Sequence, residues 1–295
     1  MAMKELIVGL KDDNKKLITY ISSIFPHLKL NNIYKALRKK DIRINEVKVS
    51  KDVIIHANDK IKIYINDDIL NGISTNITIP VVYEDDNIAI FNKPIGLEVE
   101  GKSSLTEIEE KNYGFIKPCH RIDINTCGLV LFAKNQESLS ILESKFKNEE
   151  IEKHYIALCY GITKASSATL EAYLFKDSKK SLVYISNSPQ KGYVKITTSY
   201  KVIDFNKDKK LSLLEVNLHT GRTHQIRAHL AHCGLPILGD GKYGSYEINK
   251  KFKVYTQCLE SFSLKFNFKS ESGILDYLNG KEIKLKKIPY TNFLK

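Results

Sequence analysis

The chain has little of what marks several protein classes. Only 15 of its 295 residues are glycine and seven are proline, which excludes collagen-like, mucin-like and linker-array sequences. Its five cysteines are widely spaced and form no C-x-x-C pair, which favours reduced thiols over a disulfide scaffold or a structural zinc site. The longest apolar runs, such as residues 128–133, are about a third of a bilayer span, and no signal peptide is evident. We therefore expect a cytoplasmic protein.

Positive charge, by contrast, is in excess. There are 46 Lys and Arg residues against 34 Asp and Glu, a net charge of +12, and hydrophobic residues make up 42%, enough for a folded core. Such a surplus attracts polyanions, and nucleic acid is a better candidate than an anionic membrane because no long cationic amphipathic helix is present. A lysine-rich background composition would produce the same surplus, so charge alone leaves the partner open.

The first part of the chain, residues 1–70, predicts a small α+β domain. Apolar residues at helical spacing over 17–25 predict one helix, and residues 33–40 predict a second that ends in three cations, where the helix dipole favours positive charge. Apolar residues then alternate with polar ones over 42–49 and 61–65, as they do in half-buried strands. Residues 71–79 are polar and predict a linker.

The second part, residues 80–295, predicts an α+β domain with a large sheet. Helices are expected over 136–147 and 224–232. Many short β-like runs surround them, over 87–92, 129–133, 155–159, 193–200, 211–218 and 262–266. Neither a repeat nor a low-complexity tract is visible.

Three segments of this second part could carry chemistry. In the first, residues 119–135, Asp123 follows Arg121 by two residues, and taken alone it is most simply a turn residue that bonds its own backbone. In the second, residues 153–161, Tyr155 begins an apolar strand and is, taken alone, a core tyrosine.

The third segment, residues 218–244, is rich in arginine and histidine. A metal site built on His229, His232 and Cys233 is one alternative, but no H-E-x-x-H pattern is present and no carboxylate follows until Asp240. A glycine-rich phosphate loop is weaker still, because neither phosphate-binding pattern occurs.

Taken together, these segments resemble the RluA-type RNA pseudouridine synthases. HRID-x-x-T-x-G, K-x-Y-x-A and TGR-x-HQIR-x-H with G-x-P-I-x-G-D-x-x-Y-G occur in this order, after an opening segment over 81–99 that contains NKP-x-G. The resemblance covers residues 80–295 and implies a catalytic domain with a large mixed, mainly antiparallel sheet and flanking helices. It also implies that uridines in RNA are isomerised to pseudouridine without a metal or other cofactor.

The resemblance assigns roles to individual residues. Asp123 is the catalytic carboxylate, Tyr155 lies on the uracil face, and Arg222 supplies the cation that keeps Asp123 ionised. Because the target uridine must leave its stack, Arg121 is expected to enter the vacated space, with a phosphate contact as the alternative. Arg227 and His229 are expected only to order the loop behind Arg222.

The first part resembles the S4-type RNA-binding domain, through the helix over 17–25, the segment 33–49 and the strand over 58–65. Its net charge over residues 1–75 is +5. The expected RNA contacts, with a solvated helix face as the alternative, are Lys35, Arg38, Lys39, Lys40 and Arg43.

The favoured substrate is large-subunit ribosomal RNA, here 23S, with transfer RNA as the second candidate. A non-catalytic RNA-binding or ribosome-assembly factor on the same scaffold remains the alternative from another class, although such a factor would be expected to lose one of Asp123, Tyr155 and Arg222. A metallo-hydrolase is the other enzyme alternative. No obligate protein partner is indicated.

Overall fold

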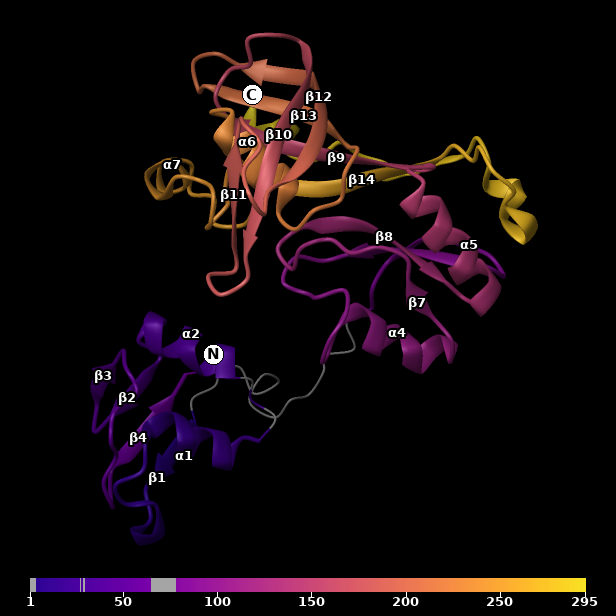
Figure 1. Ribbon diagram of the computed structural model, residues 1–295. Coiled ribbons are helices and arrows are strands. Elements are labelled where there is room, and N and C mark those ends of the chain that lie inside the picture. The colour runs from indigo at the N-terminus through magenta and orange to yellow at the C-terminus, as the bar shows by residue number, and fades with distance from the viewer. Residues whose placement is uncertain (1–3, 27, 29, 65–77) are drawn as a thin grey trace. The chain divides into compact units, whose positions relative to one another are not determined.

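The computed structural model describes residues 4–26, 28, 30–64 and 78–295, and the chain divides into two compact units, Met1–Thr78 and Ile79–Lys295 (Figure 1). The predicted linker, residues 71–79, lies outside the described residues except at its last two positions. Of these, Ile79 is buried in a core cluster of the second unit.

The first unit is a four-stranded sheet covered by two helices. Its sheet has the order β1-β4-β2-β3, and the apolar faces of both helices pack into one core with residues such as Ile42 and Ile61. The elements in chain order are β1 (Lys4–Ile7), a 3-10 turn (Leu10–Asp12), α1 (Leu17–Ile24), α2 (Leu30–Lys39), β2 (Ile42–Ile44), β3 (Val47–Val49) and β4 (Lys60–Ile63). Both helices and the later strands lie where the sequence predicts them, whereas β1 was not predicted.

Local chemistry explains the turns of this unit. Lys40, directly after α2, has φ of 59° and ends the helix in the left-handed conformation. Asn45 and Glu46 both have positive φ and join β2 to β3 in the tight turn that suits a hairpin. As a result, the basic end of α2 lies directly before the hairpin.

The second unit is built on one large sheet. Its main path has the order β11-β10-β12-β13-β9-β14-β8-β6-β5, and within the described residues β14 pairs with β8 in parallel while the other pairs are antiparallel. Its strands in chain order are β5 (Val81–Glu84), β6 (Ile88–Lys93), β7 (Lys117–Pro118), β8 (Cys127–Ala133), β9 (Ile151–Tyr160), β10 (Ser167–Asp177), β11 (Leu182–Ser186), β12 (Val194–Asn206), β13 (Leu211–Leu218), β14 (Leu259–Phe266) and β15 (Glu282–Lys284). The predicted α+β fold with a large, mainly antiparallel sheet is confirmed.

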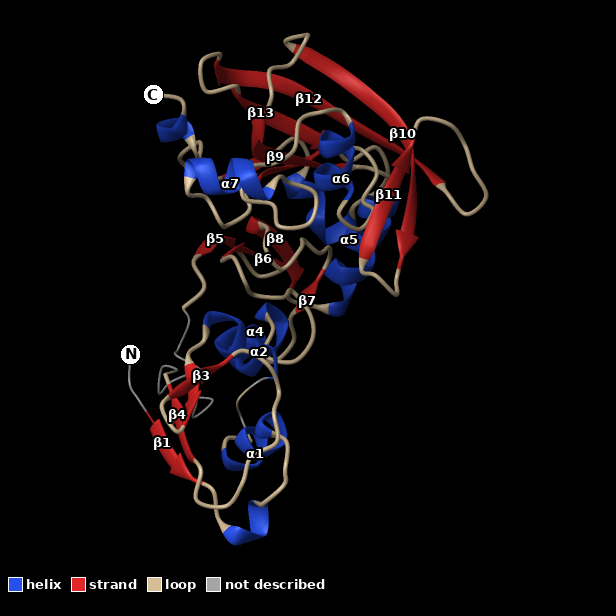
Figure 2. Cartoon of the chain, turned by 90° about the vertical axis from the view of Figure 1, so that its left-hand side faces the viewer, coloured by secondary structure: helices blue, strands red, loops and turns tan. Residues whose placement is uncertain are grey.

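Helices flank this sheet, with α6 packed against β11 and β12 and α5 packed against β8 (Figure 2). They are α4 (Leu105–Tyr113), α5 (Gln136–Lys147), α6 (Gln225–His232) and α7 (Tyr246–Phe252), followed by the 3-10 segments Gly273–Leu278 and Thr291–Phe293. The sequence predicted α5 and α6 but not α4 or α7. Ser104 and Ser245, which cap α4 and α7 by accepting backbone N–H bonds, were the available cue.

Two glycines fix the loops that form the site described below. Gly128 has φ of 104°, and a side chain there would collide with the Ser261 carbonyl where β8 meets β14. Gly239 has φ of 79° and is crowded in the same way by the Thr256 carbonyl. Within the part of the chain that the structure describes, no helix is both long and apolar enough to cross a bilayer. The five cysteines are free thiols.

Candidate active site

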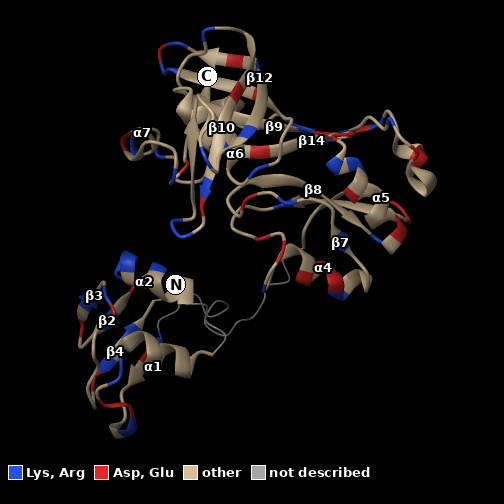
Figure 3. Cartoon of the chain, in the orientation of Figure 1, with Lys and Arg blue, Asp and Glu red and all other residues tan. Residues whose placement is uncertain are grey.

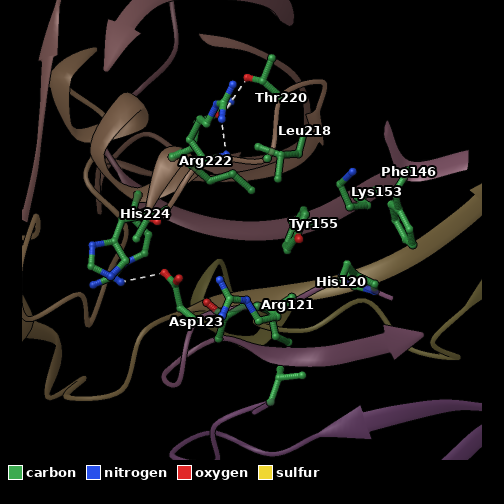
Figure 4. A pocket seen from close by; sticks show the side chains of 18 of the residues that line it. His120, Arg121, Asp123, Phe146, Lys153, Tyr155, Leu218, Thr220, Arg222 and His224 are labelled. Carbon is green, nitrogen blue, oxygen red and sulfur yellow. Dashed lines mark hydrogen bonds and ion pairs between the residues drawn. The ribbon is translucent and has the colours of Figure 1, made fainter. Parts of the chain in front are cut away.

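A pocket of about 860 Å³ in the second unit lies where three segments of the chain converge (Figure 4). The segment before β8 contributes residues 119–126, β9 contributes Lys153 and Tyr155, and the connection from β13 into α6 contributes residues 218–227. Its volume is within the usual range for a small-molecule site. The three sequence segments that could carry chemistry therefore meet in one cavity.

Asp123 reaches this pocket from the turn before β8. Its carbonyl accepts the N–H of Thr126, so the backbone closes the turn and leaves the carboxylate free for other contacts. Lys93, which is fully buried, donates its Nζ to the carbonyls of Leu97 and Ile124 and thereby ties the neighbouring segment to the Asp123 turn. The turn expected at Asp123 from this segment alone is therefore present, and its carboxylate makes a further contact.

Arg227 is the partner of that carboxylate. Its Nη1 lies 2.8 Å from Asp123 Oδ2, while Nε and Nη2 lie 2.7 and 3.0 Å from the two oxygens of Asp240. Asp240 also accepts the backbone N–H groups of Lys242 and Tyr243. Burial opposes the charge on Arg227, but the two carboxylates outweigh it and raise the pKa of the guanidinium. The three groups form one buried charge network with Arg227 at its centre.

The prediction that Arg222 supplies the cation beside Asp123 is wrong. Arg222 is exposed in the loop ahead of α6, and its backbone N–H donates to Gln225 Oε1. Arg227 lies in the first turn of α6, in a run from Gln225 to Leu230 that is buried throughout, so its side chain must point into the protein. Position on the helix, which the motif alone does not give, decides which arginine meets Asp123.

Tyr155 lies on β9 and lines the same pocket (Figure 4). It is 4% exposed and stands between Val216 of β13 and Ser261 of β14 in the sheet register. Burial, followed by the negative charge of Asp123, raises the pKa of its hydroxyl above the usual range. Tyr155 is therefore a neutral aromatic surface at neutral pH, with a hydroxyl that stays protonated.

Comparison with known proteins agrees with this geometry. The RNA pseudouridylate synthase family matches residues 87–232, which include all three pocket-forming segments. A Mycoplasma capricolum protein described as an uncharacterized RNA pseudouridine synthase is 33% identical over 304 residues, covering 95% of this chain and 97% of that protein. The chain belongs to the RNA pseudouridine synthase family. It is thus an enzyme, an isomerase, and the family predicted from the sequence is confirmed.

Other relatives carry more specific names. The ribosomal large subunit pseudouridine synthase C of Rickettsia prowazekii is 31% identical over 93% of this chain and 94% of its own length. The protein of the same name from Buchnera aphidicola is 28% identical over 88% of each chain. Among solved structures, human RNA pseudouridylate synthase domain containing 1 superposes with a TM-score of 0.62 at 21% identity over 75% of this chain and 88% of its own. That likeness shows the synthase fold.

Arg121 stands at the mouth of the synthase pocket. Its side chain is 72% exposed, and its Nη1 lies 3.5 Å from Glu100 Oε2. An ion pair this exposed is worth little, so the guanidinium is free to exchange partners. Arg121 and Asp123 line the same pocket, and the expected entry of Arg121 into the vacated space stays a prediction.

The sequence analysis assigned no role to several residues that line the pocket. Phe146 at the end of α5 lines the pocket together with Lys153, whose Nζ lies 5.1 Å from the Phe146 ring centre. His120 lies 5.0 Å from the same ring and accepts the Leu131 N–H through Nε2. Burial lowers the pKa of His120 to about 3, which keeps it neutral. No motif links α5 to β9, so only folding brings these residues together.

His224 lies beside the charge network, directly before α6. Val183 N–H donates to Tyr243 Oη, and the same hydroxyl shares a hydrogen bond of 2.9 Å with His224 Nδ1. Burial is the largest cause that lowers the pKa of His224, and the positive charge of Arg227 adds to it. The side chain is thereby held neutral next to Asp123 (Figure 4). Among the described residues no group of histidines, cysteines and carboxylates is arranged to hold a metal ion.

His229 makes stability depend on pH. It is 1% exposed, its Nδ1 lies 3.1 Å from Thr198 Oγ1, and burial lowers its pKa to about 4. The unfolded chain takes up a proton near pH 6.5 and the folded chain only near pH 4, so stability is full above pH 6.5 and falls as the pH drops. We expect His229 alone to remove about 2 kcal/mol between pH 7 and pH 5.

Urea unfolding followed by circular dichroism checks this expectation. His229→Gln keeps a polar partner for Thr198 but cannot be protonated, so its unfolding free energy should fall less between pH 7 and pH 5 than that of the wild type. The exposed His232, which lies 2.8 Å from Asn187 Oδ1, provides the control His232→Gln. Equal pH dependence in His229→Gln and the wild type would contradict the assignment.

Proposed function

We propose that Asp123 is the catalytic carboxylate with which this synthase converts uridine to pseudouridine in structured RNA. The observation that carries the proposal is that the two oxygens of this carboxylate differ in their hydrogen-bond partners. Oδ2 is held by Arg227, whereas Oδ1 accepts no hydrogen bond from any residue that the structure describes. A carboxylate oxygen that lines the pocket without a partner is available to a substrate.

Beyond this carboxylate, the reaction requires few protein groups. The glycosidic N–C bond breaks, the uracil turns over, a C–C bond forms, and the proton on the newly attached carbon is lost while the released nitrogen gains one. Asp123 attacks or stabilises the carbon electrophile that this sequence creates. The guanidinium of Arg227 keeps the carboxylate ionised and fixes its direction, because its other two donors are locked onto Asp240.

Tyr155 and Arg121 would act on the base and on the RNA around it. A uridine in the pocket would place its ring against the neutral Tyr155 side chain, where stacking favours a planar base. To enter the pocket the uridine must leave its helix, which costs a few kcal/mol. Arg121 is exposed at the pocket mouth and long enough to occupy the vacated position. Arg222, exposed on the opposite loop, would contact a phosphate.

Large-subunit ribosomal RNA is the favoured substrate. The supporting observation is the name of relatives that match nearly the whole chain at 28–31% identity, each a ribosomal large subunit pseudouridine synthase C. Transfer RNA is the second candidate. A cytoplasmic setting belongs to the proposal and is supported by the five free cysteines.

The test compares RNA from cells with and without the gene. Pseudouridine is mapped chemically across ribosomal and transfer RNA, and the deletion strain is complemented with the wild type or with Asp123→Asn. Loss of sites in large-subunit RNA that only the wild type restores supports the full proposal. Loss of sites in transfer RNA alone would make transfer RNA the substrate in place of ribosomal RNA. Restoration by Asp123→Asn would refute the catalytic role of the carboxylate.

We also propose that the first unit is an S4-like RNA-binding domain that ends near residue 70. The exposed side of α2 presents Lys35, Arg38 and Lys39, and Lys40 follows it, all exposed (Figure 3). Arg43 is less available, because it lies 3.8 Å from Glu46 and 5.1 Å from the Tyr64 ring centre. Cations on the side of a helix that faces away from the core are suited to phosphate contacts.

Salt dependence measures these contacts. Replacing Arg38, Lys39 and Lys40 together with glutamine should lower the slope of log affinity against log salt by about 2–3, since each lost phosphate contact removes close to one released counterion. The matched control replaces Lys11, Lys16 and Lys51, which are also exposed on this unit. Equal slopes for the two triple variants would mean that α2 does not bind RNA.

A further inference from the structure

The hairpin of β10 and β11 carries exposed aromatic rings that the active site does not use. Phe175 and Tyr184 are 36% and 40% exposed and pair directly across the two strands. Their neighbours Leu174 and Val183 are buried on the side of α6, so the rings point to the other face of the sheet. We name the rings of Tyr173, Phe175, Tyr184 and Tyr193 the aromatic face.

The rings of this face lie together. Phe175 and Tyr193 are stacked, with ring centres 5.4 Å apart and planes 27° apart. Tyr173 is two residues from Phe175 on the same strand and therefore on the same side of the sheet. Three segments that meet only in the folded sheet thus bring two exposed rings, Phe175 and Tyr184, and two half-buried rings, Tyr173 and Tyr193, to one side. Clustered exposed rings of this kind mark an interaction surface rather than scattered surface residues.

Positive charge surrounds the aromatic face. Residues 171–195 contain five lysines and two acidic residues. Both acidic residues are already paired, Glu171 with Lys195 and Asp177 with Lys180. No ion pair with any described residue involves the remaining lysines, and the tip of the hairpin is correspondingly basic (Figure 3). These three are Lys179 and Lys191, close in sequence to the rings, and Lys176, which alternation places on the opposite side of β10 from Phe175. The surface therefore suits a polyanion that also contains flat rings able to stack on these side chains.

Hydrogen bonds connect the β10–β11 hairpin to segments beside the active site. β11 is the edge strand of the large sheet, and its Val183 N–H donates to the Tyr243 hydroxyl that holds His224. At the hairpin tip, Lys242 Nζ donates to the Ser181 carbonyl at 2.8 Å. The edge strand that carries Tyr184 is thus linked through the Tyr243 hydroxyl to His224, which lines the pocket.

We propose that the aromatic face binds a single-stranded stretch of the substrate RNA by base stacking, with the neighbouring lysines on its phosphates. The inference rests on the proposed function and adds a second RNA-binding surface on the catalytic unit. Single-stranded nucleic acid is commonly held in this way, by rings that accept any base together with cations along the backbone. A second copy of this chain would bury the rings but would gain nothing from the surrounding lysines, so RNA is the better partner.

The test uses the full chain and an oligoadenylate of about twelve nucleotides, which contains no uridine for the active site. Phe175→Ala and Tyr184→Ala should each weaken binding by about 5- to 10-fold, and the double variant by more. Phe175→Tyr should retain binding. The matched control is Phe205→Ala, a ring on β12 that is more exposed than Phe175 and Tyr184 and lies outside the aromatic face.

The salt dependence of binding distinguishes the contribution of the aromatic rings from that of the lysines. The alanine variants should keep the wild-type salt dependence, because stacking releases no counterions. Lys179→Gln with Lys191→Gln should lower the slope by about 1.4, since each contact with single-stranded nucleic acid contributes close to 0.7. With a folded RNA substrate, the double aromatic variant should raise KM and leave kcat within about twofold, because the rings are remote from the reacting atoms.

Two results would overturn the inference. One is an oligoadenylate affinity of the double variant within about twofold of that of Phe205→Ala. The other is a double variant that sediments as a monomer where the wild type is a dimer, which would assign the rings to self-association. The measurement does not depend on turnover, so it stays decisive even if Asp123→Asn proves active and the catalytic proposal fails.

Discussion

Asp123→Asn should lower the rate of pseudouridine formation by on the order of 10⁴-fold or more while RNA affinity changes little. The amide has nearly the shape of the carboxylate but carries no charge and is a poor nucleophile, so an interaction needed only during the reaction is lost. Single-turnover release of a labelled hydrogen from the uracil C5 position measures the effect without interference from product release. RNA affinity is measured in parallel with the same transcript.

The control for this variant is Asp208→Asn, an exposed aspartate in the β12–β13 turn. It removes the same charge from the protein and should leave turnover and binding unchanged. If Asp123→Asn keeps more than about a hundredth of the wild-type rate, the carboxylate is not the reacting group. A large loss of RNA affinity in that variant alone would instead show that Asp123 holds the substrate in its ground state.

Arg227→Lys should lower kcat by about 10²- to 10³-fold, and Arg222→Lys should change it by less than about threefold. Arg227 uses three nitrogens on two carboxylates, and a lysine ammonium cannot match that geometry. Arg222 is exposed and donates no side-chain bond to Asp123, so a lysine there keeps the charge that a phosphate contact needs. The two variants make the same chemical change five residues apart.

Stability provides a second readout for Arg227. Arg227→Met leaves Asp240, whose side chain is 0% exposed, without its cation. Breaking a buried pair in this way costs about 3–5 kcal/mol of unfolding free energy. The matched variant Arg222→Met should cost less than about 0.5 kcal/mol. If Arg222→Lys were the more damaging of the two lysine variants for kcat, Asp123 would exchange its partner for Arg222 when RNA binds.

Residue order and periodicity were enough for the fold class, for most of the elements and for the family. Apolar periodicity predicted α1, α5 and α6, and alternation predicted the strands around them, because those patterns follow from the repeat of each backbone. Four motifs in the expected order identified the RNA pseudouridine synthase family. The charge surplus pointed to RNA, and the motif order selected Asp123 and Tyr155, which the structure places in one pocket.

Only the tertiary structure decided which cation meets Asp123. The resemblance selected Arg222, but the boundary of α6 turns Arg227 inward and leaves Arg222 in solvent. A buried arginine needs carboxylates, and its second partner, Asp240, comes from a loop shaped by Gly239. The aromatic face likewise exists only once β10, β11 and the segment before β12 pair. Sequence determined which groups the chain carries, whereas long-range pairing determined which of them touch.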